Sequence, residues 1–224
     1  MPHDAPGRAA RPAVLLALAV FSLLTVVGLA IVASPAWSGA EIHAIAWVQG
    51  VHGPVLDRAA VTIDAVFGDM GAVLVLGGAA VGIVVGSRSV RLAVRFGLVA
   101  GVPWVAAEVI KVVVQRPRPD AALLHAPLVA HPSSSSFPSG HTAFAAALVC
   151  AMLIVLAPRR GRAGWAVLGC VLVLATAWSR VYLGVHYPTD VAASMLVVPP
   201  VAVAVDRLAA SWAMRPRALA TVGS

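Results

Sequence analysis

Three short polar clusters, KVVVQRPRP (residues 111–119), PSGH (138–141) and SRVYLGVHYPTD (179–190), interrupt a stretch that is otherwise almost entirely apolar. The whole 224-residue chain is 60% hydrophobic and 11% charged, with a mean hydropathy of +0.92, which is the composition of an integral membrane protein. A water-soluble domain of this size would need more polar surface. We therefore expect membrane helices that position the three polar clusters.

Six apolar runs are predicted to cross the membrane. The first, residues 13–33, is uninterrupted for 21 residues, and about 20 helical residues span the hydrocarbon core. A cleaved signal peptide is the alternative for this run, but its apolar region is only ~7–15 residues long, and Pro35 lies where a small-residue cleavage site would be needed. The other spans are predicted at residues 70–86, 91–114, 141–156, 163–181 and 189–212.

Residues 34–67, between the first and second spans, mix charged residues and tryptophans with apolar ones, which predicts one or two amphipathic helices along the membrane interface. Residues 115–139 contain five prolines and cannot form a continuous helix. The expected fold class is all-α: a polytopic membrane protein with six transmembrane helices and an interfacial amphipathic segment, forming a single domain over residues 1–224.

The distribution of basic residues predicts the orientation. Eleven of the 16 lysines and arginines lie on the side of the two termini, whereas the opposite side carries seven of the nine acidic residues. By the positive-inside rule, the termini and the basic turns at residues 87–91 and 158–162 are cytoplasmic. All three polar clusters are then expected to open to the outside face of the plasma membrane.

Three cations lie at the ends of predicted helices, namely Lys111, Arg118 and Arg180. A cation in this position requires an anionic partner; any one of them could instead extend to the lipid headgroups, but three beside two histidines favour a bound phosphate. Arginine grips phosphate through two parallel hydrogen bonds. Pro138 and Ser139 are predicted to start the fourth helix, whose free N–H groups suit an anion, and Gly140 would let that backbone approach closely. An ordinary serine cap is the alternative for Ser139.

Two histidines lie in the clusters, His141 and His186. Asp190 can accept the Nδ1 proton of His186, which leaves Nε2 as a lone pair that can attack phosphorus. His141 is then the candidate general acid for the departing oxygen. The other five histidines are interpreted as hydrogen-bonded structural residues: His3, His43, His52, His125 and His131.

No metal, cofactor or nucleic acid is expected. The chain has no HExxH, no CxxC and no dense carboxylate group, and the cations of the candidate site would repel a divalent metal. Cys150 and Cys170 lie in apolar runs and are interpreted as small buried hydrophobic residues. The net charge of +7 is spread between apolar runs, so the expected partners are the lipid bilayer and a lipid phosphate.

The clusters, written as KxxxxxxRP (111–119), PSGH (138–141) and SRxxxxxHxxxD (179–190), resemble the signature of the type 2 phosphatidic acid phosphatase (PAP2) family of membrane lipid phosphatases. The soluble vanadium haloperoxidases share its pocket, but six predicted spans argue against that branch. Arg116 is two residues out of register with Lys111, and we give it at most a secondary electrostatic role. Glu108, one helical turn before Lys111, is close enough to pair with it.

The resemblance implies a role for each matching position. Five residues would form the phosphate cradle, namely Lys111, Arg118, Ser139, Gly140 and Arg180. Three would carry the chemistry: His186 as the nucleophile that forms a phosphohistidine, Asp190 as its orienting partner and His141 as the acid for the leaving group.

The expected function is therefore a metal-independent phosphatase for a lipid phosphate or diphosphate. Undecaprenyl diphosphate or a related isoprenyl diphosphate is the first expectation for the substrate, with phosphatidic acid and phosphatidylglycerol phosphate as alternatives. Two other classes of function remain open, a phosphotransferase and a non-catalytic binder or transporter of anionic lipid that uses the same pocket.

Overall fold

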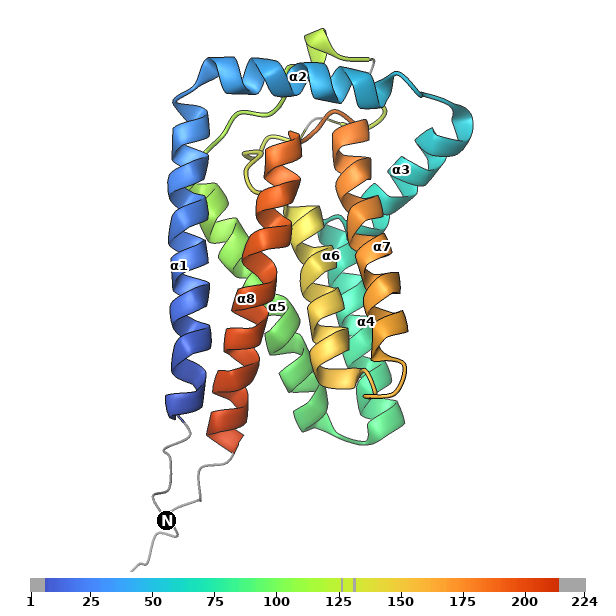
Figure 1. Cartoon of the computed structure of the whole chain (residues 1–224). Coiled ribbons are helices and arrows are strands. Elements are labelled where there is room, and N and C mark those ends of the chain that lie inside the picture. Colours follow the sequence, from blue (N-terminus) through green and yellow to red (C-terminus); the bar gives the residue numbers. More distant parts are fainter. Residues whose placement is uncertain (1–6, 126, 131, 214–224) are drawn as a thin grey trace, which may run out of the picture.

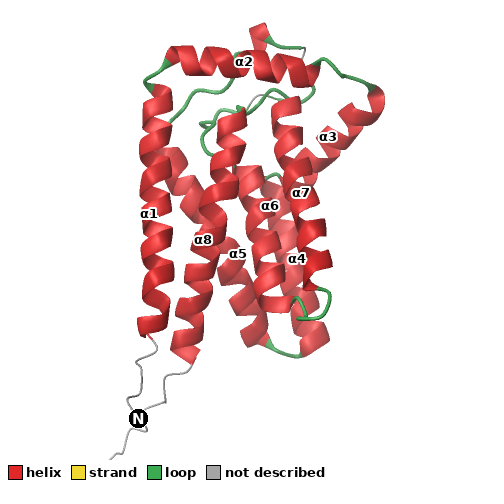
Figure 2. Cartoon of the chain, in the orientation of Figure 1, coloured by secondary structure: helices red, strands yellow, loops and turns green. Residues whose placement is uncertain are grey.

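The computed structural model describes residues 7–125, 127–130 and 132–213, and within them it contains helices and loops but no strand (Figures 1 and 2). The predicted all-α class is confirmed. The helices are α1 (Gly7–Val32), α2 (Pro35–Gln49), α3 (Pro54–Phe67), α4 (Asp69–Ser87), α5 (Val90–Val114), the short 3-10 helix η1 (Ala121–Leu123), α6 (Gly140–Ala151), the π-helical turn η2 (Met152–Leu156), α7 (Arg162–Tyr182) and α8 (Pro188–Ala213).

Five of the six predicted spans are long and apolar enough to cross a membrane, namely α1, α4, α5, α7 and α8. The remaining one, α6 with its π-helical turn, covers only Gly140–Leu156. Figure 1 shows why it is short: α6 begins deeper in the bundle than the upper ends of α7 and α8. Its sequence suits this central place, because alanines let neighbouring helices approach closely and nearly every residue of α6 is buried. Six crossings stay a prediction.

The interfacial segment forms two helices, α2 and α3, each with a proline in its first turn. Figure 1 shows α2 lying across the end of the bundle. Its side chains are arranged differently from a simple amphipathic helix, because Glu41 and Gln49 are buried whereas Trp37 and Trp47 are exposed. The reason is that α2 covers the polar end of the bundle, and the exposed tryptophans suit the membrane interface predicted for this segment.

The clusters and the basic turns lie at opposite ends of the bundle (Figure 1). The turns after α4 and α6 lie at the same end as the start of α1 and the end of α8, as the distribution of basic residues predicted. Arg215 and Arg217 of the tail, like His3 and His131, lie outside the described residues. Which side of the membrane each end occupies stays a prediction.

The two cysteines differ in burial. Cys150 on α6 is half-buried and packs against the core formed by α5, α6 and α8. Cys170 on α7 is exposed, so its interpretation as a buried residue was wrong. An apolar run predicts that a residue lies in a span, but it does not tell whether the residue faces another helix or lipid.

Candidate active site

The three polar clusters line one cavity of about 630 Å³ at the end of the bundle that α2 covers. Helices α3, α4, α5, α6 and α7 and the loops before α6 and α8 all contribute to its wall. Six of the eight predicted site residues line it, namely Lys111, Arg118, Gly140, His141, Arg180 and His186. Ser139 and Asp190 are fully buried behind this lining.

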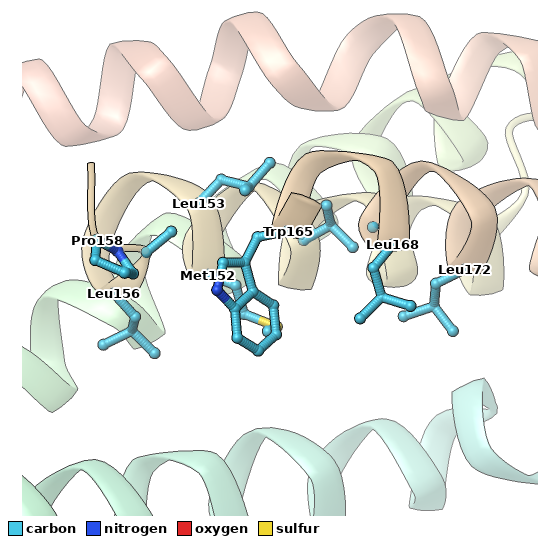
Figure 3. Close-up of a pocket in the computed structure, with 10 residues that line it drawn as sticks. Met152, Leu153, Leu156, Pro158, Trp165, Leu168 and Leu172 are labelled. Atoms are coloured by element: carbon cyan, nitrogen blue, oxygen red, sulfur yellow. The ribbon is translucent and has the colours of Figure 1, made fainter. Parts of the chain in front are cut away.

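A second cavity, of about 250 Å³, has a different character (Figure 3). It lies between α7 and the C-terminal turns of α6, and its wall includes Met152, Leu156, Trp165 and Leu172. No charged residue lines it. It therefore has no groups for phosphate chemistry, and the candidate site is the polar cavity.

Lys111 enters the polar cavity from the last turn of α5. Its Nζ donates to both carboxylate oxygens of Glu108, at 2.8 and 2.9 Å, which confirms the pair that the spacing predicted. The pair lies against Gly140, where an added Cβ would be 2.7 Å from Oε1 of Glu108 and 3.1 Å from Nζ of Lys111. The absence of a side chain at Gly140 therefore lets this ion pair approach the start of α6.

Arg118 is held by the loop and turn around the cavity. Its Nε donates to the carbonyl of Ser134 (2.8 Å) and its Nη1 to the carbonyl of Val185 (2.7 Å). Burial and the nearby charge of Arg180 lower the pKa of Arg118 to about 10, so the guanidinium stays charged at neutral pH. Lys111 and Arg180 are each paired with a carboxylate, whereas in the described part of the chain none lies within ion-pair distance of Arg118. Its charge is therefore available to an anionic ligand.

His186, in the turn between α7 and α8, is only 1% exposed. Burial, together with the charges of Arg118 and Arg180, holds its pKa well below the ordinary value of 6.5, so the imidazole is neutral at pH 7. Its Nε2 lies 3.1 Å from Nη1 of Arg118. Because a guanidinium can only donate, Nε2 is the acceptor and the ring proton is on Nδ1. This is the tautomer that a nucleophilic Nε2 requires.

Asp190 lies behind His186 in the first turn of α8, as predicted. Its Oδ2 is 3.4 Å from Nδ1 of His186 and accepts a hydrogen bond from the backbone N–H of Tyr187 at 2.8 Å. The 3.4 Å contact is too long for a good hydrogen bond, and among the described residues Nδ1 of His186 has no other partner. Catalytic hydrogen bonds are often long without substrate and shorten when it binds.

His141 begins α6 and shares a partner with Arg180. Its Nε2 is 3.2 Å from Oδ1 of Asp64, and Nη1 of Arg180 donates to the same oxygen. Burial raises the pKa of Asp64, but the hydrogen bond with His141 and the charge of Arg180 outweigh it and lower the pKa to about 2. An ionised carboxylate therefore joins the candidate acid to one cation of the cradle.

Asp64 was not among the predicted site residues. It lies in the last turn of α3, where the negative end of the helix dipole disfavours a carboxylate. That unfavourable position is a signal in the sequence that could have suggested a cationic partner.

Ser139 is the N-cap of α6, and its Oγ accepts hydrogen bonds from the backbone N–H and the hydroxyl of Thr142. Its backbone N–H donates to the carbonyl of Asp190 at 3.1 Å. The side chain thus follows the alternative of an ordinary cap, and a direct contact between Ser139 and phosphate stays a prediction. The backbone bond fixes the start of α6 beside the start of α8.

Arg116 lies outside the polar cavity, as its register relative to Lys111 indicated. Its secondary electrostatic role takes the form of contacts behind the cavity wall. It is 1% exposed and forms two buried ion pairs, with Asp190 and with Glu41, each at 2.7 Å. The spacing from Lys111 predicts which arginine faces the cavity. It does not predict the ion pairs that Arg116 forms behind the cavity wall.

The histidines outside the clusters lie outside the cavity where they are described. His52 contacts Asp57 at 2.8 Å, and its ring packs against the rings of His125 and Tyr182. His43 is exposed on α2. A structural role is therefore supported for His52 and His125.

The curated proteins that this sequence matches include three whose names describe a phosphatase or diphosphatase. Undecaprenyl-diphosphatase BcrC of Bacillus subtilis is 36% identical over 104 residues, covering 45% of this chain and 51% of BcrC. Decaprenylphosphoryl-5-phosphoribose phosphatase of Mycobacterium tuberculosis is 41% identical over 116 residues, covering 50% and 60%. Phosphatidylglycerophosphatase B of B. subtilis is 41% identical over 100 residues, covering 42% and 46%. The chain thus spans about half the length of the curated relatives it matches.

The fold also has a solved counterpart. The crystal structure of a transmembrane PAP2-type phosphatidylglycerolphosphate phosphatase from B. subtilis superimposes with a TM-score of 0.70, covering 91% of this chain and 98% of that one at 23% identity. The family model of the PAP2 superfamily matches residues 90–205, from the start of α5 into α8, and includes all three polar clusters. Because this match covers more than half of the 224 residues, the protein belongs to the PAP2 superfamily.

Proposed function

We propose that the protein is a membrane lipid phosphatase that removes a terminal phosphate through a phosphohistidine on His186. The observation that carries this proposal is the geometry of His186: a neutral imidazole with its proton on Nδ1 and its Nε2 beside Arg118 in the polar cavity. A protein that only bound anionic lipid would need the cations and not the oriented histidine. The oriented histidine therefore favours an enzyme over a non-catalytic binder or transporter of anionic lipid.

The reaction has two steps. Nε2 of His186 attacks phosphorus in line, the bond from phosphorus to the leaving oxygen breaks, and His141 gives that oxygen a proton. Water then attacks the phosphohistidine, His141 takes the proton of the water, and release of phosphate restores His186. Lys111, Arg118 and Arg180 stabilise the negative charge on the transferring phosphoryl group in both steps.

For the substrate we propose an isoprenyl diphosphate such as undecaprenyl diphosphate. The name of the relative BcrC supports this choice, whereas the name phosphatidylglycerophosphatase B supports the alternative of phosphatidylglycerol phosphate. We place the site on the outer face of the plasma membrane, because 11 of the 16 basic residues lie toward the other side.

The test is phosphate release by the detergent-purified protein from undecaprenyl diphosphate, phosphatidic acid and phosphatidylglycerol phosphate, each with and without EDTA. Among the described residues, no three histidine, cysteine or carboxylate side chains are grouped to hold a metal ion, so we expect full release in EDTA. Loss of activity in EDTA, restored by added metal, would reject the mechanism. Transfer of phosphate to an added alcohol in place of water would identify a phosphotransferase.

Asp64→Asn is expected to lower kcat/KM by about 30-fold, because Oδ1 of Asp64 aligns both His141 and Arg180. The matched control is Asp69→Asn, which removes the same charge from the wall of the same cavity and should change kcat/KM by less than about threefold. Steady-state kinetics on the two variants makes the comparison. Equal losses would show that only the total charge of the cavity matters.

A further inference from the structure

Arg116 connects three elements from a buried position behind the nucleophile. Its Nη1 donates to Oδ1 of Asp190 at 2.7 Å, and its Nη2 donates to Oε2 of Glu41 at 2.7 Å. The guanidinium also lies over the ring of Tyr187, with its central carbon 3.7 Å from the ring centroid. Since Arg116 is absent from the wall of the polar cavity, it acts on the residues around the site and not on the substrate.

Asp190 needs this cation. Its side chain is fully buried, and an ionised carboxylate in such a place is strongly unfavourable unless it is paired. His186 is neutral and contributes no compensating charge. The ion pair with Arg116 therefore keeps Asp190 charged. Because Nη1 of Arg116 holds Oδ1 and the N–H of Tyr187 holds Oδ2, the carboxylate is fixed with Oδ2 facing Nδ1 of His186.

Glu41 extends the arrangement to α2. Its Oε1 accepts from the backbone N–H of Thr189 at 2.8 Å, and its Oε2 accepts from the Thr189 hydroxyl at 2.9 Å. The N–H of Thr189 belongs to the first turn of α8, where helical partners are lacking. Glu41 thus holds both Arg116 and the start of the helix that carries Asp190. In Figure 1, α2 lies across the end of the bundle that contains the start of α8.

We propose that Arg116 is a positioning residue for the nucleophile, which orients His186 by fixing Asp190, and that Glu41 couples the interfacial helix α2 to this pair. The inference rests on the proposed function, since it assigns Arg116 to the same phosphohistidine reaction. Arg116 and Arg118, two residues apart, then have different tasks: Arg116 supports the nucleophile and Arg118 binds the phosphate.

The test compares Arg116→Gln with Arg118→Gln. Arg116→Gln should lower kcat by about 100-fold and change KM, and the inhibition constant for inorganic phosphate, by less than about threefold. Arg118→Gln should raise both KM and the inhibition constant by about tenfold or more. Arg116→Lys keeps the charge without the fork and should retain more activity than Arg116→Gln. Weaker phosphate binding in Arg116→Gln, equal to that in Arg118→Gln, would overturn the inference.

A double-mutant cycle separates positioning from general stability. In an Asp190→Asn background, Arg116→Gln should cost less than about threefold in kcat, because both changes break the same connection. If the fold loss in kcat of the double variant equals the product of the losses of the two single variants, the inference is overturned. Size-exclusion chromatography checks folding; if Arg116→Gln aggregates, Arg116→Lys and Glu41→Gln enter the same cycle. Wild-type protein that releases no phosphate would reject the proposed function itself, whereas active wild-type with full kcat in Arg116→Gln rejects only this inference.

Discussion

His186→Ala is expected to lower phosphate release by about 10⁴-fold or more, because it removes the atom that accepts the phosphoryl group. The cavity should still bind the lipid, since Lys111, Arg118 and Arg180 remain in its wall. The variant should therefore bind substrate with nearly normal affinity while turning it over at the background rate. An intermediate on nitrogen also has a chemical signature, because a phosphoramidate is labile to acid and stable to base.

The measurement is single-turnover reaction with labelled lipid, quenched in base and followed by mass spectrometry of the protein. In the wild-type protein we expect an acid-labile, base-stable phosphate on the peptide that contains His186. In His186→Ala we expect no label on the protein. His43→Ala, a change at an exposed position on α2, is the matched control and should leave both label and rate unchanged. Label on any other side chain, or release undiminished in His186→Ala, would refute the nucleophile.

The pH dependence follows from the same residue. Burial and the neighbouring cations lower the pKa of His186 below 6.5, and the neutral form is the nucleophile. As pH falls, the neutral form persists until the lowered pKa is reached, so the acid limb of kcat/KM that belongs to His186 lies below pH 6.5.

Much of the fold could be predicted because a helix that crosses the hydrocarbon core of a membrane needs a run of about 20 apolar residues. Apolar runs located the helices that became α1, α4, α5, α7 and α8, with ends within a few residues except at the start of α1. Such a run is a poorer guide where a helix packs mainly against other parts of the protein and not against lipid or water. Thus the run predicted at residues 141–156 forms α6 and its π-helical turn but is too short to be a candidate membrane span, and α2 buries Glu41 because it faces the polar end of the bundle.

The candidate site divides in the same way. The spacing within the three clusters indicated His141, His186, Lys111 and Arg118, and all four line the cavity. Residues that support them come from distant segments. Asp64 reaches His141 from α3, and no spacing within the three clusters indicates a partner so far away in the chain.

His141→Ala is expected to show a loss that depends on the leaving group. A lipid oxygen departs poorly without a proton, so release from a lipid phosphomonoester should fall by about 10³-fold. A nitrophenolate departs without protonation. With nitrophenyl phosphate, the first step of His141→Ala should therefore remain within about tenfold of wild type, while His186→Ala shows no such rescue.

The second step separates the two histidines further. In His141→Ala, water lacks the base that takes its proton, so the phosphohistidine formed from nitrophenyl phosphate should accumulate and give a burst of one nitrophenolate per protein. Rapid-quench measurement of nitrophenolate and of protein-bound phosphate tests this result. Equal losses on lipid and aryl substrates, with no burst, would show that His141 binds phosphate and transfers no proton. A burst that is matched by label on His186 would assign His141 to both proton transfers, because only a group that acts in each step slows lipid cleavage and also traps the intermediate.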